Sequence, residues 1–163
     1  MKIGKKMEDA INAQITHEFE AEHTYLGIAA YFESLAMPGF AHWMGKQAAE
    51  ERTHAMKFFK YLCERGGKVE MGGMEKPLSA FKSPLAAFEA AYAFELTTTK
   101  KINALYELAA AEKDFATSSM LKWFIDEQVE EESNAVQNIE QVKMAGDSKG
   151  ALMHLDHRLG KRE

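Results

Sequence analysis

Cysteine is almost absent from this sequence, since Cys63 is the only one in 163 residues. A lone cysteine cannot form a disulfide within the chain, which is typical of proteins from a reducing compartment. It also excludes the clustered thiolate ligands of structural zinc and iron–sulfur sites. We expect the Cys63 thiol to be a small, buried packing group on its helix.

Long hydrophobic runs are also absent, and none approaches the roughly 18 residues of a membrane span. The first six residues, MKIGKK, lead into an acidic amphipathic segment, whereas a secretory signal would continue with an apolar core. We therefore expect a cytoplasmic protein without a membrane partner. The 25 acidic and 20 basic residues give a net charge of −5, which disfavours nucleic acid as a ligand and favours cations.

Proline is scarce as well, and the three prolines, at positions 38, 77 and 84, lie between periodic segments. Elsewhere apolar residues recur every three or four positions, and the alternation typical of strands is missing. The pattern predicts one all-α domain over 1–163. Its expected helices cover about 4–36, 39–65, 84–112, 116–145 and 148–159, the last of them short and amphipathic.

The segment 66–83 is rich in glycine and is too long for an ordinary turn. The helix before it, about 27 residues long, would measure ~40 Å, whereas 18 extended residues reach up to ~60 Å. The segment can therefore cross the whole length of a bundle, so that the helices on either side of it are parallel. The prediction is a ferritin-like antiparallel four-helix bundle with one long crossover and a short fifth helix.

Each of the four long helices carries polar residues in the middle of an apolar face. Glu51 and His54 lie in one such stripe, and Glu18 lies in a second. The third stripe contains Glu95, and the fourth contains Gln128 and Glu131. Carboxylates are seldom buried unless they are paired or bound to a metal, because removing an isolated charge from water costs many kcal/mol.

These residues should meet at mid-height of the bundle, because antiparallel neighbours bring their central residues to the same level. The set would supply two adjacent divalent ions, with Glu51 placed to bridge them and His54 as the imidazole ligand. Carboxylate and imidazole ligands suit iron. We therefore expect a di-iron site, with Tyr25 within reach of it.

Taken singly, each signal also has a plain structural explanation. The pair Glu51 and His54 fits an exposed face or a satisfied core histidine, and Tyr25 fits a core aromatic whose hydroxyl is hydrogen-bonded. The acidic run 126–132 fits a solvated face. Their joint placement at the inward positions of four helices favours the metal centre.

The sequence resembles the ferritins, most closely the bacterial non-haem ferritins, along essentially its whole length. The residues that carry the resemblance are Glu18, Tyr25, Gln47-x-x-Glu50-Glu51-x-x-His54, Glu95, Lys101-Ile102-Asn103 and Trp123-x-x-x-Glu127-Gln128-x-Glu130-Glu131.

The resemblance implies a set of metal ligands. Glu18, Glu51 and His54 would hold one iron, and Glu51, Glu95 and Glu131 the other, with Gln128 alongside. A third iron beside the pair would have Glu50, Glu127, Glu130 and Glu131 as its ligands. Haem is not expected, because Arg52, Gln128 and Glu131 occupy the places where haem-containing relatives have a methionine and a second Glu-x-x-His.

The activity implied by the resemblance is that of a ferroxidase, in which Glu51, His54 and Tyr25 take part in oxidising Fe(II) with dioxygen or hydrogen peroxide. The Fe(III) mineral would be stored inside a homo-oligomeric cage of 24 subunits.

Two rival functions belong to other classes. A rubrerythrin-like di-iron peroxidase would use a similar bundle, but it normally needs an electron donor or an iron–cysteine domain, which one cysteine cannot build. A metal-free helical interaction bundle would tolerate Glu51→Ala and gain stability from it, because the change removes a buried charge.

Overall fold

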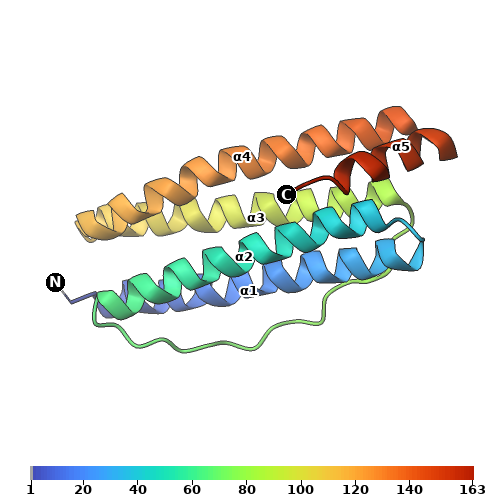
Figure 1. The fold of residues 1–163 in the computed structure, drawn as a ribbon. Helices are drawn as coiled ribbons and strands as arrows, with labels where there is room; N and C mark the ends of the chain where they lie inside the picture. Colours follow the sequence, from blue (N-terminus) through green and yellow to red (C-terminus); the bar gives the residue numbers. More distant parts are fainter. Residues whose placement is uncertain (1) are drawn as a thin grey trace.

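A computed structural model describes residues 2–163, and all regular secondary structure in that range is helical. Met1, the first residue of the predicted domain, lies outside the described range. The helices are α1 (Lys5–Ser34), α2 (Pro38–Glu64), α3 (Pro84–Ala111), α4 (Phe115–Ala145) and α5 (Lys149–Leu159). Four long helices form a bundle and α5 packs against one end of it (Figure 1). The predicted all-α fold class is therefore confirmed.

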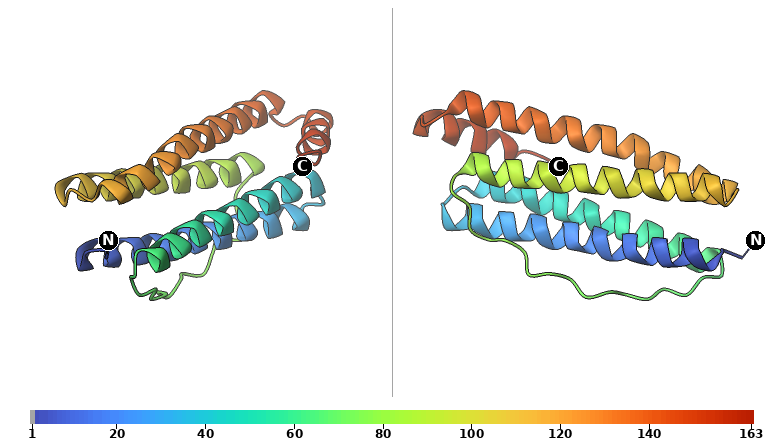
Figure 2. Two further views of the ribbon diagram at one scale, coloured as in Figure 1. Left: turned by 60° about the vertical axis from the view of Figure 1, so that its left-hand side comes forward. Right: turned by 180° about the vertical axis from the view of Figure 1, so that it is seen from behind.

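The connection between α2 and α3 runs along the whole bundle, on the outside of α1 (Figures 1 and 2). Side chains of α1 hold this crossover in place. Asn12 Nδ2 donates to the carbonyl of Lys68 at 2.9 Å and Asn12 Oδ1 accepts from the amide of Glu70 at 2.8 Å, while Thr16 Oγ1 accepts from the amide of Gly72 at 3.0 Å. The crossover carries the chain from the end of α2 back to the end of the bundle where α2 begins. Helices α2 and α3 therefore run parallel, as the long segment 66–83 predicts.

Gly27 on α1 allows the crossover to pass close to the helix. A Cβ at this position would lie 2.4 Å from the carbonyl oxygen of Leu78, closer than real Cβ contacts permit. A side chain there would push the crossover away from α1.

The helix ends follow local chemistry. Ser83 caps α3 by accepting from the amide of Ala86, with Pro84 in the first turn. Asp114 caps α4 by accepting from the amide of Thr117, and Arg65 at the end of α2 binds both of its carboxylate oxygens at 3.0 Å. The first helix ends at Ser34, two residues earlier than expected, because Ala36 takes a left-handed conformation with φ 55°.

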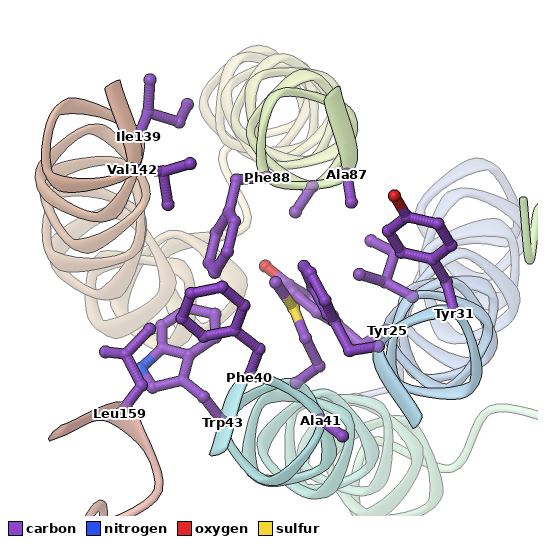
Figure 3. Packing of buried hydrophobic residues seen from close by; sticks show 14 of the residues in the cluster. Tyr25, Tyr31, Phe40, Ala41, Trp43, Ala87, Phe88, Ile139, Val142 and Leu159 are labelled. Carbon is purple, nitrogen blue, oxygen red and sulfur yellow. The ribbon is translucent and has the colours of Figure 1, made fainter. Parts of the chain in front are cut away.

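The interior consists of two hydrophobic clusters. One lies toward the end of the bundle that carries α5 and includes Phe40 and Phe88 (Figure 3). The rings of these two residues and of Phe32 lie 5.0–5.5 Å apart. The other fills the opposite end and includes Phe58 and Phe124, whose rings stack at 4.0 Å. The predicted polar residues lie on the four helices between these two clusters.

The bundle is wider on one side than on the other. Within the described chain no Cα atom of α2 lies within 8 Å of one of α4, whereas α1 and α3 approach each other that closely. Large side chains span the wide side: the His54 ring forms T-shaped contacts with the rings of Trp123 and Phe124 at centroid distances of 5.5 and 6.0 Å. The space around His54 is thus filled by side chains rather than by close backbone packing.

The short helix α5 folds back onto the start of α2. Leu155 and Leu159 join the hydrophobic cluster at this end, and Asp156 Oδ1 accepts from the amide of Phe40 at 2.8 Å. Gly39 makes this approach possible, since a Cβ there would lie 1.8 Å from the carbonyl oxygen of Asp156.

Cys63 is exposed, so the prediction of a buried thiol is wrong. Its neighbour Leu62 takes the buried position on α2, and a step of one residue turns a side chain by about 100° around the helix, here toward solvent. None of the helices in residues 2–163 combines the length and hydropathy needed to cross a membrane.

Candidate metal centre

A belt of polar side chains crosses the bundle between the two hydrophobic clusters. All seven central residues of the predicted site belong to it and are at most 5% exposed: Glu18, Tyr25, Glu51, His54, Glu95, Gln128 and Glu131. They come from α1, α2, α3 and α4. The structure therefore brings together the residues that the four helical stripes predicted to meet, while their binding of metal stays a prediction.

Glu18, Glu51 and His54 form the tightest group in this belt. Each offers one ligand atom, and these atoms all lie within 4.8 Å of one another. Glu51 and His54 lie three residues apart on one face of α2, with Glu51 Oε2 3.1 Å from His54 Nδ1. No other set of three His, Cys, Asp or Glu residues in the range 2–163 is as close.

Two oxygens of this triad have no hydrogen-bond partner in the described structure: Glu18 Oε2 and Glu51 Oε1. The other oxygen of Glu18 accepts from Gln14 Nε2 at 2.7 Å. A buried acceptor without a partner costs about 1–3 kcal/mol, and more if it is charged. A divalent cation between the two carboxylates and His54 would satisfy both oxygens, so these residues fit a metal.

The carboxylates of α3 and α4 are held by hydrogen bonds instead. Tyr25 donates its hydroxyl proton to Glu95 Oε1 at 2.6 Å, and Gln128 Nε2 lies 3.2 Å from Glu95 Oε2. Gln47 Nε2 donates to Glu131 Oε2 at 2.7 Å. Glu95 and Glu131 do not belong to the tight triad, although the resemblance places them in the second ligand set with Glu51.

Burial raises the pKa values of the four carboxyl groups. The pKa of Glu18 rises to about 8, first because of desolvation and then because of the neighbouring Glu51. Desolvation and the charge of Glu95 raise the pKa of Glu131 to about 7 and that of Glu51 well above its usual range. Desolvation also raises the pKa of Glu95. Without a metal Glu18 keeps its proton near neutral pH and Glu131 is about half protonated, and a cation must displace these protons.

The residues predicted for a third iron lie at the margin of this belt. Glu127 Oε1 is 4.0 Å from His54 Nε2, and Glu50 Oε2 accepts from Arg162 at 2.7 Å. Glu130 is exposed and lines a cleft with Arg162. The structure does not gather these carboxylates into one tight group, so their role stays a prediction.

Four polar partners of the belt were not among the predicted site residues: Gln14, Gln47, Thr99 and Arg162. Gln14 had a usable signal, because it precedes Glu18 by four residues and so lies on the same face of α1. Thr99 accepts from Gln128 Nε2 at 3.1 Å, and it stands on the helical stripe of Glu95. Arg162 lies in the C-terminal tail, where no periodic pattern points to the belt.

Comparison with known proteins decides the family. The model of the ferritin-like domain matches residues 8–145, which is most of the chain. The chain belongs to the ferritin family. The predicted resemblance is confirmed, and family membership supports iron storage as the role of the protein.

Relatives match along nearly the full length. The bacterial non-heme ferritin of Bacteroides fragilis is 39% identical over 160 residues, covering 98% of this chain and 99% of the relative. That of Staphylococcus aureus is 38% identical, covering 98% and 96%. An open-pore ferritin structure from the archaeon Archaeoglobus fulgidus is 45% identical with a TM-score of 0.98, covering 99% of this chain and all of that one.

Proposed function

We propose that the protein oxidises Fe(II) at a di-iron ferroxidase centre within each subunit and stores the Fe(III) product as a mineral. The observation that carries this proposal is the pair of unpartnered oxygens, Glu18 Oε2 and Glu51 Oε1, buried beside His54. Such a group is costly in a bundle without metal and is satisfied by bound cations.

Iron is the substrate in this reaction. Glu18, Glu51 and His54 would bind one Fe(II), and Glu51, Glu95 and Glu131 the second, with Glu51 shared between them. Two Fe(II) ions give up one electron each. Dioxygen accepts both electrons with two protons and leaves as hydrogen peroxide; if peroxide is the oxidant, its O–O bond breaks and two waters form.

The protein contributes position, exclusion of water and control of protons. The hydrophobic clusters on both sides of the belt keep bulk solvent from the ions, which strengthens their attraction to the carboxylates. Fe(II) binding displaces the protons that the raised pKa values of Glu18 and Glu131 retain near neutral pH. Tyr25 holds Glu95 through its hydroxyl group.

Storage needs a container, and we infer a hollow cage of 24 copies of this chain in the cytoplasm. Membership of the ferritin family and the full-length match to ferritin structures support the cage. A cage of 24 chains of 18.3 kDa would have a mass of roughly 440 kDa, which gel filtration separates from a single chain.

The rival functions predict different behaviour. A metal-free bundle would bind no cation at the belt, and the buried carboxylates of Glu18 and Glu51 argue against it. A rubrerythrin-like peroxidase would need an outside electron donor for turnover, whereas the proposed reaction takes its electrons from Fe(II) itself.

The test is aerobic addition of Fe(II) to the metal-free protein, followed by ultraviolet absorbance of Fe(III). We expect rapid oxidation by the unmodified protein and only background oxidation by the Glu51→Ala/His54→Ala variant. Glu64→Ala is the matched control, because Glu64 lies on the same helix with an exposed side chain. Equal rates in all three proteins would contradict the assigned centre.

A further inference from the structure

The C-terminal tail, residues 160–163, reaches the edge of the polar belt through one side chain, Arg162. Packing of α5 on α2 fixes the direction of the tail, with Leu159 beside Trp43 (Figure 3). After Gly160 the chain turns along α2, where His42 Nε2 lies 2.8 Å from the carbonyl oxygen of Arg162. The guanidinium carbon then lies 4.8 Å from the centre of the Trp43 ring, which is a cation–π contact.

The guanidinium of Arg162 contacts two residues at the edge of the belt. Its Nη2 donates to Glu50 Oε2 at 2.7 Å, and its Nη1 donates to Gln47 Oε1. Gln47 is completely buried and donates through Nε2 to Glu131 Oε2 at 2.7 Å. Arg162, Gln47 and Glu131 thus form a chain of hydrogen bonds from the tail to a predicted metal ligand.

Arg162 determines which end of the Gln47 amide faces the carboxylate. A guanidinium has only donors, and the ionised carboxylate of Glu131, the form that binds a metal, has only acceptors. If the amide were flipped, its NH₂ group would face the guanidinium and its oxygen would face Glu131, and both hydrogen bonds would be lost. With Arg162 in place, Gln47 must present its donor to Glu131.

Arg162 also neutralises Glu50, the direct sequence neighbour of Glu51. Without this partner the Glu50 carboxylate would be free to turn toward cations, or toward the NH₂ group of Gln47, in competition with Glu131. Both contacts of Arg162 therefore favour the arrangement in which Gln47 Nε2 donates to Glu131 Oε2.

We propose that Arg162 is a positioning residue for the second metal position. It acts through Gln47 to hold Glu131 ready for the ion that Glu51, Glu95 and Glu131 would share. The first position, at Glu18, Glu51 and His54, has no hydrogen bond to this chain of contacts among the described residues. The inference rests on the proposed function, since it assumes that the belt binds two ions.

The test measures anaerobic binding of Co(II), a probe that is not oxidised here, to the assembled full-length protein by calorimetry. Outer-sphere partners of metal ligands typically change affinity by 10–100-fold. We expect Arg162→Ala to weaken the second binding step by about tenfold, while the first step changes by less than about twofold. A structural role alone would weaken both steps together.

Two further variants sharpen the test. Arg162→Lys keeps the charge and the packing stem but loses the forked donors, so we expect an intermediate loss of about threefold at the second step. The double variant Arg162→Ala/Gln47→Leu should bind about as weakly as Gln47→Leu alone, because both changes interrupt one chain of contacts. Arg158→Ala is the control, since Arg158 lies on α5 just before the tail and bonds Gln141 instead.

The outcomes separate this inference from the proposed function. If the unmodified protein binds two Co(II) ions and Arg162→Ala binds the second equally well, the role of Arg162 is wrong and the di-metal centre stands. Equal weakening of both steps would also overturn it. If the unmodified protein binds no Co(II) at the belt, the proposed function and this inference fail together.

Discussion

The two sides of the polar belt differ in how their carboxylates are satisfied. On the α1 and α2 side, Glu18 and Glu51 each keep one buried oxygen without a hydrogen-bond partner in the described structure. On the α3 and α4 side, both oxygens of Glu95 and one of Glu131 accept hydrogen bonds from Tyr25, Gln128 and Gln47.

This difference predicts unequal affinities for the two proposed metal positions. On the first side a cation that displaces the carboxyl protons gains two oxygens, Glu18 Oε2 and Glu51 Oε1, that accept no hydrogen bond from another side chain. On the second side a cation must compete with existing donors or share the carboxylates with them. We therefore expect the triad of Glu18, Glu51 and His54 to bind its ion more tightly.

Glu51 would be shared by both proposed metal positions, so its removal should have the largest effect. Losing an outer-sphere partner weakens metal binding by up to roughly 100-fold, and we expect Glu51→Ala to weaken both Co(II) binding steps by more than that. Glu18→Ala should lose only the first binding step, and Glu131→Ala only the second. Calorimetric titration measures these steps. The metal-free Glu51→Ala protein should melt no earlier than the unmodified one, because a poorly satisfied buried carboxyl group is gone. Loss of a single step in Glu51→Ala would show that the positions share no ligand.

The raised pKa values predict that the metal-free protein loses stability as pH rises. The pKa of Glu18 in the fold is about 8 and that of Glu131 about 7, both above their ordinary value of 4.5. Between pH 4.5 and these raised pKa values the folded state therefore holds more protons than the unfolded state. The free energy of unfolding falls with rising pH over this range, until the pH has passed about 7 for Glu131 and about 8 for Glu18. We expect the melting temperature to fall from pH 6 to pH 8.5, and less steeply in Glu18→Gln. Glu64→Gln, an exposed control, should follow the unmodified protein; an equal slope in Glu18→Gln would contradict the assignment.

Added Co(II) should reverse this trend, because the metal replaces the protons of the same carboxyl groups. The metal-induced rise in melting temperature should be larger at pH 8 than at pH 6, and binding should release protons into a weakly buffered solution. Binding without proton release would mean that the carboxyl groups are already ionised.

Tyr25→Phe should affect only the second side. The change removes the hydroxyl group that donates to Glu95 Oε1 and keeps the ring within its hydrophobic cluster. We expect the second Co(II) step to weaken by about tenfold, as for other outer-sphere partners, with the first step unchanged. Tyr31→Phe makes the same chemical change away from the belt and should leave both steps unaffected. A change in the first step alone would reverse the assignment of sides.

Gln14→Ala should have the smallest effect, and on the first side only. Gln14 donates a neutral hydrogen bond to Glu18 Oε1, and such a bond contributes about 1 kcal/mol, or roughly a fivefold change in affinity. We expect the first Co(II) step to weaken by that factor. Gln137→Ala, an exposed glutamine on α4, is the control. An unchanged first step would show that Glu18 keeps its position without Gln14.

The fold followed from features that depend only on local sequence. Helical periodicity, the prolines at positions 38 and 84, and the length of the segment 66–83 determined the helices and their directions. The belt followed as well, because antiparallel helices of similar length place their central residues at one level. The closeness of Glu51 and His54 could be predicted from the geometry of a single helix, because they lie three residues apart.

Side-chain orientation and distant contacts could not be predicted in this way. Nothing in the local sequence shows that Glu18 lacks a partner for one oxygen while Glu95 has partners for both. Arg162 meets Glu50 across 112 residues of sequence, and this contact depends on how α5 folds back. Cys63 was misplaced because neighbouring positions on a helix face different environments.

The crossover between α2 and α3 has spare length. Helix α2, with 27 residues, spans ~40 Å, whereas the 19 residues 65–83 can extend over ~60 Å. Residues 71–76 are all exposed, and a side chain at Gly73 would meet nothing within 4 Å. Insertions and short deletions should therefore be tolerated around Gly73, whereas the turn of three residues at 35–37 has no slack and should keep its length.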